Sequence, residues 1–141
     1  MVYLCGALNS FILDYVLRFK VSANISMFYV YQLPIPRLTV HDRYCQTIAE
    51  RVARVVCIGS EFDSLRQELL GSATAHVATN PIERQHLQNE IDALVAHLYG
   101  LQEEELEHIL YAPYTFPLVG REIKDAVMAA FARVEEMLEL G

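Results

Sequence analysis

The stretch NPIERQHLQNEIDALVAHLYG, residues 80–100, predicts one long amphipathic helix. Asn80 is a favoured capping residue, Pro81 stands at the first helical position, and Glu83 follows three residues after the cap. Gly100 supplies a C-terminal stop. Between these signals apolar residues recur at helical spacing, at Leu87, Ile91, Leu94, Val95 and Leu98. This helix should bury that side against the rest of the chain.

Helical periodicity continues on both sides of this stretch. Apolar residues at helical spacing predict five further helices, over residues 4–19, 41–58, 61–70, 102–111 and 121–140. The first of these is apolar on nearly every side, so it should be buried on more than one face. Small and polar residues make 71–79 a loop, and two prolines bracket an irregular link before the last helix.

Residues 27–33 differ from these segments because they are rich in aromatic and β-branched side chains, which predicts a short strand. Pro34 and Pro36 cannot donate to a sheet ladder and should end it. The expected fold class is therefore mainly α, a helical domain with one or two short β-strands near the N-terminus. We expect two parts, a helix-plus-strand region over residues 1–38 and a helical scaffold over residues 39–141.

The net charge of −7 over 141 residues hides an asymmetry between the two ends of the chain. Residues 1–60 hold six basic and three acidic residues, and residues 61–141 hold five basic and fifteen acidic ones. The net charges are therefore +3 and −10, and any polyanion should contact only the first part. A chance split on a solvated surface explains the same numbers.

The sequence favours a protein of the reducing cytoplasm and predicts no membrane span. The longest apolar segment, residues 4–19, contains four polar residues and is shorter than the ~20 apolar residues that a bilayer requires. The N-terminus has no basic region and no small-residue cleavage site of a secretory signal. The three cysteines are odd in number and form no Cys-x-x-Cys pair.

Signs of catalysis are weak. Glu83-x-x-His86 and Glu105-x-x-His108 match the spacing of di-iron helical bundles, but on a helical wheel Glu105 and His108 point away from the apolar stripe. We therefore expect solvated helix faces and no metal. Cys45 with His41 one turn earlier could form a thiolate pair, although a lone buried cysteine is the commoner case. Phosphate-binding loops and the nucleophile elbow are missing, and we expect no catalytic residues.

Polar and basic residues gather between two of the most hydrophobic segments. Arg18 and Lys20 close the first predicted helix, and hydroxyl and amide side chains follow directly. Such side chains contact phosphates and base edges in DNA complexes, although they also occur in ordinary turns. The candidate DNA-binding residues are Arg18, Lys20, Ser22, Asn24, Ser26 and Arg37.

Two stretches carry a resemblance to a known family. YLCGALNSFILDYVLRFKVSANISMFYVYQLPIP, residues 3–36, resembles the distal part of the target-recognition region of adenine-specific DNA methyltransferases in fused type II restriction–modification enzymes. It is more loosely similar to the repeats of type I specificity subunits. LQNEIDALVAHLYGLQEEELEHIL, residues 87–110, is similar to a segment near the C-terminus of the same methyltransferases. Phe116-Pro117 and Arg121-Glu122-Ile123 follow in the expected order.

The resemblance implies the non-catalytic C-terminal specificity part of a restriction–modification N6-adenine methyltransferase. The catalytic half, which binds S-adenosylmethionine and holds the flipped adenine, would lie upstream in the parent enzyme. We therefore expect no cofactor in this chain, and double-stranded DNA and the upstream methyltransferase domain as partners. An apolar face left without its neighbours could make a homodimer. The alternative function is a helical protein–protein interaction or dimerisation module without a role on nucleic acid.

Overall fold

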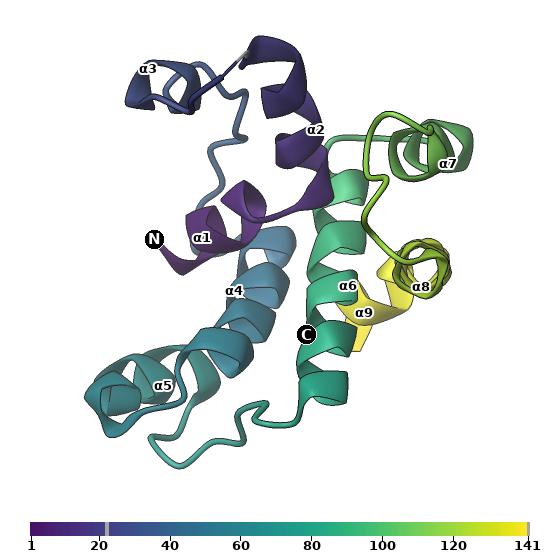
Figure 1. Cartoon of the computed structure of the whole chain (residues 1–141). Coiled ribbons are helices and arrows are strands. Elements are labelled where there is room, and N and C mark those ends of the chain that lie inside the picture. Colours follow the sequence, from purple (N-terminus) through teal and green to yellow (C-terminus); the bar gives the residue numbers. More distant parts are fainter. Residues whose placement is uncertain (22, 141) are drawn as a thin grey trace.

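Helix α6 (Pro81–Leu98) lies at the centre of the molecule, and the other long helices surround it (Figure 1). The computed structural model describes residues 1–21 and 23–140. Asn80 caps α6 as predicted, because its side-chain oxygen accepts a hydrogen bond from the Ile82 N–H at 2.8 Å. Glu83 was expected to bond back to this cap, but it pairs instead with His76 at 2.6 Å.

The remaining helices follow most of the predicted segments. Gly71 and Gly100 end helical stretches with φ of 75° and 70°, a conformation that glycine adopts without strain. In the described part of the chain the helices besides α6 are α1 (Val2–Leu8), α2 (Phe11–Lys20), α3 (Met27–Val30), α4 (Arg43–Val56), α5 (Asp63–Leu70), α7 (Glu103–Tyr111), α8 (Arg121–Phe131) and α9 (Val134–Leu140). A short 3-10 helix, Ser60–Phe62, precedes α5.

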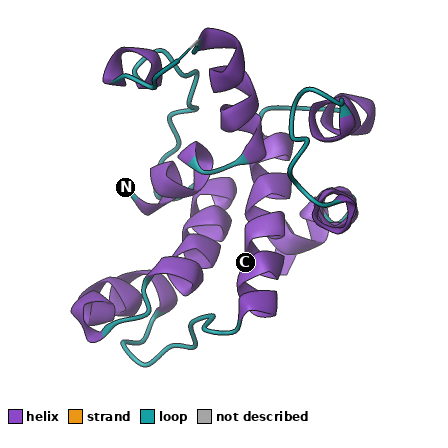
Figure 2. Ribbon diagram, viewed as in Figure 1, coloured by secondary structure: helices purple, strands orange, loops and turns teal. Residues whose placement is uncertain are grey.

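The predicted N-terminal strand is wrong. Residues 27–30 form the one-turn helix α3, and the described residues contain helices and loops without any strand (Figure 2). The N–H of Tyr31 donates to the carbonyl of Met27 at 3.0 Å, which closes a helical turn within the segment. Aromatic and β-branched residues favour strands only where a neighbouring strand is available, and none of the described residues provides one.

The predicted helix over residues 4–19 is two helices, α1 and α2, bent by 60°. The break falls at Asn9 and Ser10, whose side chains bond the backbone in place of continuing the helix. The amide of Asn9 donates to the Cys5 carbonyl at 2.8 Å, and the Ser10 hydroxyl donates to the Ala7 carbonyl at 2.7 Å. None of the described helices is by itself long and apolar enough to cross a membrane, and only the bent pair α1 and α2 together reaches that length and composition.

One hydrophobic core runs through the molecule around α6. It combines Ile12 of α2, Ile48 and Val52 of α4, and Leu94 of α6 with side chains of α7, α8 and α9. Residues from both predicted parts of the chain therefore share this core. That residues 1–38 belong to a recognition region and residues 39–141 form its scaffold stays a prediction.

Candidate functional site

Helix α2 carries Arg18 and Lys20 at its C-terminal end, and its first turn is held by hydrogen bonds and packing. Asp92 of α6 accepts a hydrogen bond from the Phe11 N–H at 2.7 Å, and Ser10 accepts one from the Leu13 N–H at 3.4 Å. The ring of Phe11 packs edge-on against Phe116, with 4.7 Å between the centroids. The start of α2 is thus fixed while its end extends outward toward α3 (Figure 1).

Arg18 is engaged within its own chain. Its guanidinium lies 2.9 Å from the carboxylate of Asp14, one turn earlier, and 4.8 Å from the ring centroid of Phe116. Both members of the ion pair are about half exposed, and such surface pairs contribute about 0–1 kcal/mol. Arg18 therefore needs to give up only a weak interaction to reach a phosphate.

Lys20, the last residue of α2, is exposed. Asn24 and Ser26, which precede α3, are exposed as well. Ser22, predicted with them, lies outside the described residues. No carboxylate of the described chain forms an ion pair with Lys20. The structure thus brings three of the six predicted residues together on a polar segment at the edge of the molecule.

Arg37 is exposed but lies apart from that segment. The chain returns from α3 toward α1, where the Tyr3 hydroxyl donates to the Pro36 carbonyl at 3.1 Å. The Tyr99 hydroxyl donates to the Pro34 carbonyl at 2.8 Å, and burial raises the pKa of Tyr99 to about 12, so the donor keeps its proton. These two bonds place Arg37 beside α1, whereas Lys20 is at the far end of α2.

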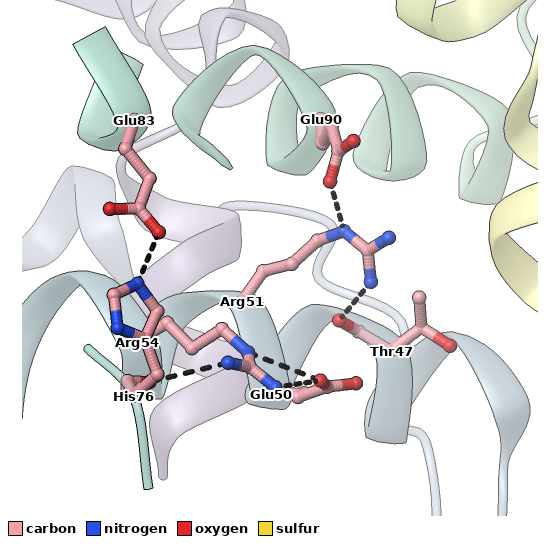
Figure 3. Close-up of polar contacts among 7 residues, drawn as sticks. All are labelled: Thr47, Glu50, Arg51, Arg54, His76, Glu83 and Glu90. Carbon is pink, nitrogen blue, oxygen red and sulfur yellow. Dashed lines mark hydrogen bonds and ion pairs between the residues drawn. The ribbon is translucent and has the colours of Figure 1, made fainter. Parts of the chain in front are cut away.

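Much of the predicted positive charge of the first part is neutralised inside the fold (Figure 3). On α4, Arg51 pairs with Glu90 of α6 at 2.7 Å, and both side chains are only 14% and 13% exposed. Arg54, one turn on, pairs with Glu50 at 2.9 Å and donates to the His76 carbonyl at 3.2 Å. Arg51 and Arg54 thus bind groups of the fold itself. The candidates for binding a polyanion are therefore the exposed basic residues on the α2–α3 side.

Large apolar side chains surround the polar segment. Five of them are 59% to 80% exposed, and we call them the α2–α3 apolar surface: Phe19, Ile25, Met27, Phe28 and Tyr31. None of these five residues belongs to the hydrophobic core. A surface of this kind is typical of a contact with another protein or another copy of the chain.

Asp92 is the functional candidate that sequence reasoning missed. It is 8% exposed on the central helix, and burial raises the pKa of its carboxyl from 3.8 to about 7, partly offset by the hydrogen bond from Phe11. Its neighbours Ala93 and Ala96 are fully buried, which shows that α6 is enclosed on more than the predicted stripe. The available signal was the apolar run that follows Asp92, residues 93–96.

Metal-binding geometry is not found in the described part of the chain, where no three His, Cys, Asp or Glu side chains gather closely enough to hold an ion. Of the two Glu-x-x-His pairs, Glu83 bonds His76, and His108 lies 3.4 Å from the Tyr114 hydroxyl. Cys45 is partly buried, and burial together with the nearby Asp42 raises the pKa of its thiol, which disfavours the thiolate.

Comparison with known proteins adds no relative: no protein family, no curated protein and no solved structure matches this chain.

Proposed function

We propose that this chain is the non-catalytic C-terminal DNA-recognition part of a restriction–modification adenine methyltransferase. The segment from Lys20 to Ser26 contacts the DNA backbone and groove, Arg18 and Arg37 add phosphate contacts, and the acidic helices of residues 39–141 form a scaffold for the upstream methyltransferase domain. The observation that carries the proposal is the exposure of Lys20, Asn24 and Ser26 together at the projecting end of α2. The family resemblance of residues 3–36 supports it.

The charges of the chain limit how tightly it can bind by itself. A net charge of −7 repels DNA at long range. Among the proposed cationic contacts Arg18 is paired with Asp14, whereas Lys20 and Arg37 form no ion pair within the described residues. Phosphate contacts make affinity fall steeply as salt rises, and non-specific binding has a Kd of roughly 10⁻⁴–10⁻⁶ M. The isolated chain should therefore bind duplex DNA weakly and with strong dependence on salt.

Fluorescence anisotropy with a labelled random duplex tests this proposal. The variant Lys20→Glu/Arg37→Glu is compared with Arg121→Glu/Arg133→Glu, which changes the net charge equally but lies in the acidic part of the chain. We expect the first variant to lose low-salt binding while the second keeps most of it. Equal losses in the two variants, or no binding by the wild-type chain at low salt, would contradict the proposal.

A second function, self-association as an interaction module, is favoured by the α2–α3 apolar surface. Phe28 and Met27 are the residues to change, because both are exposed and the α3 helix that carries them buries none of its residues. In this alternative, sedimentation velocity detects dimers that persist at high salt and disappear in Met27→Ser/Phe28→Ser. A monomer at every concentration, with the same sedimentation as that variant, would exclude it.

A further inference from the structure

A cavity of about 590 Å³ opens between α1, α4, α6 and the loop that precedes α8. This volume falls in the range of small-molecule sites, which are mostly apolar with a few placed polar groups. Apolar side chains form most of the wall, among them Phe11, Val52, Ile91, Val119 and Ile123. The proposed DNA contacts lie elsewhere, so this cavity is independent of the function proposed above.

Asp92 is the only carboxylate in the lining of this cavity. Its Oδ1 accepts the hydrogen bond from Phe11, and no other hydrogen bond or ion pair to Asp92 is formed by the described residues. The second oxygen, Oδ2, accepts no hydrogen bond from the described residues, and Asp92 belongs to the lining of the cavity. A buried carboxylate without a cation is costly, and a charged donor arriving through the cavity would stabilise it.

Arg84 is the other charged side chain of the lining, and it is already bound to the backbone. Its Nη1 donates to the carbonyls of Val55 at 2.6 Å and Ala78 at 3.0 Å. Arg84 and Asp92 are eight residues apart on α6, which separates them by about 12 Å along the helix. The guanidinium of Arg84 is thus held by these two carbonyls and forms no ion pair with Asp92.

We propose that this cavity binds a small amine, with the protonated amino group at Asp92 and an apolar body against Phe11, Val52 and Ile91. The ammonium donates to Oδ2, the carboxylate oxygen that the fold leaves without a partner. The amide side chains of Asn9, Gln85 and Gln88 also line the cavity and can accept further N–H donors of such a ligand.

The protonation of Asp92 gives this site a pH dependence. Burial raises the pKa of Asp92 to about 7, so part of the protein carries a neutral carboxyl near neutral pH. Cys5 and Arg84 are the other ionisable side chains of the lining. Affinity for an amine should therefore rise as pH increases through ~7, where Asp92 loses its proton.

Isothermal titration calorimetry with benzylamine tests the proposal, with benzyl alcohol and benzoate as neutral and anionic probes of similar size. Asp92→Asn removes the charge but keeps an oxygen that can accept from Phe11, so α2 remains anchored. Gly120→Leu leaves Asp92 intact and adds an apolar side chain at a residue of the lining, where a Cβ meets no atom within 4 Å. Ala132→Leu introduces the same side chain at an exposed position that is not part of the lining.

We expect saturable benzylamine binding that weakens by about tenfold or more in Asp92→Asn and in Gly120→Leu, and stays unchanged in Ala132→Leu. Benzyl alcohol and benzoate should bind at least about tenfold more weakly than benzylamine. The proposal is overturned if benzyl alcohol or benzoate binds as well as benzylamine, or if a folded Asp92→Asn variant keeps the wild-type affinity. Absence of benzylamine binding at a mildly alkaline pH, where Asp92 is charged and benzylamine is still protonated, would also overturn it.

Discussion

Gly6 should be the position of α1 least tolerant of a larger side chain. A Cβ added there would lie 2.6 Å from Cγ2 of Val52 and 3.0 Å from Cγ2 of Ile48. Both neighbours are β-branched residues in the buried face of α4, so neither can rotate freely out of the way. Helix α1 would have to move away from α4.

The magnitude of the effect follows from two opposing terms. Overpacking of a well-packed core costs typically about 1–3 kcal/mol. Alanine in place of glycine inside a helix returns up to about 1 kcal/mol. Since the nearest contact would fall well below van der Waals distance, we expect Gly6→Ala to lower the free energy of unfolding by about 1–2 kcal/mol, and Gly6→Val by more.

Urea unfolding followed by the helical circular dichroism signal measures this change. Gly120→Ala is the matched control, because its Cβ meets no atom within 4 Å and its φ of −61° suits any residue. Gly120 is the N-cap residue of α8, where glycine is preferred over alanine. The loss of this preference opposes the smaller entropy of the unfolded chain, so the net change should stay below about 1 kcal/mol. If Gly6→Ala were more stable than the wild type by about 1 kcal/mol, helix propensity alone would explain it and the close packing of α1 on α4 would be refuted.

Two further predictions concern buried charges on α6. For Asp92 the folded-state pKa of about 7 exceeds the ordinary value of 3.8, so the folded protein retains a proton that the unfolded chain releases between those values. The free energy of unfolding should therefore fall as pH rises through this window. Above the window, Asp92→Asn should be more stable than the wild type by up to about 4 kcal/mol. If urea unfolding at a series of pH values gave the same pH dependence of stability in both proteins, this prediction would be wrong. For the pair of Arg51 and Glu90, Arg51→Leu should cost about 3 kcal/mol, because Glu90 keeps only the distant His86, whose Nδ1 lies 3.6 Å away. The double variant Arg51→Leu/Glu90→Leu should recover most of that loss, and additive effects in a double-mutant cycle would exclude coupling.

Most helices could be predicted from the sequence because the residues that begin and end a helix act on neighbouring backbone groups. The cap at Asn80 and the stops at Gly71 and Gly100 depend on neighbouring backbone groups, which the sequence displays directly. The strand over residues 27–33 failed because strand formation depends on a pairing partner, which composition does not reveal. Asn9 and Ser10 were a signal for the break between α1 and α2, because the side chains of both residue types compete for backbone hydrogen bonds. The break between α8 and α9 at Ala132 and Arg133 has no comparable signal, because both residues favour helices.

The candidate sites were harder to predict because they depend on contacts between distant segments. Arg51 was counted as a basic residue of the first part, but Glu90, 39 positions away, neutralises it. Asp92 looked like an ordinary polar position of an amphipathic helix, and only the packing of α1 and α2 on α6 encloses it. Lys20, Asn24 and Ser26 were predicted as one group, and all three are exposed. This part of the DNA proposal could be predicted because the three residues are close together in the sequence.

The dependence of DNA affinity on salt tests the central claim most directly. Each phosphate contact contributes about −0.9 to the slope of log Kobs against log salt, so the proposed contacts by Arg18, Lys20 and Arg37 predict a slope of about −2.7 for the wild-type chain. Lys20→Gln should make the slope shallower by about 1, whereas Arg133→Gln, an exposed change in the acidic part, should leave it unaltered. A slope near zero, or the same change in both variants, would contradict the assignment of the α2–α3 segment to DNA.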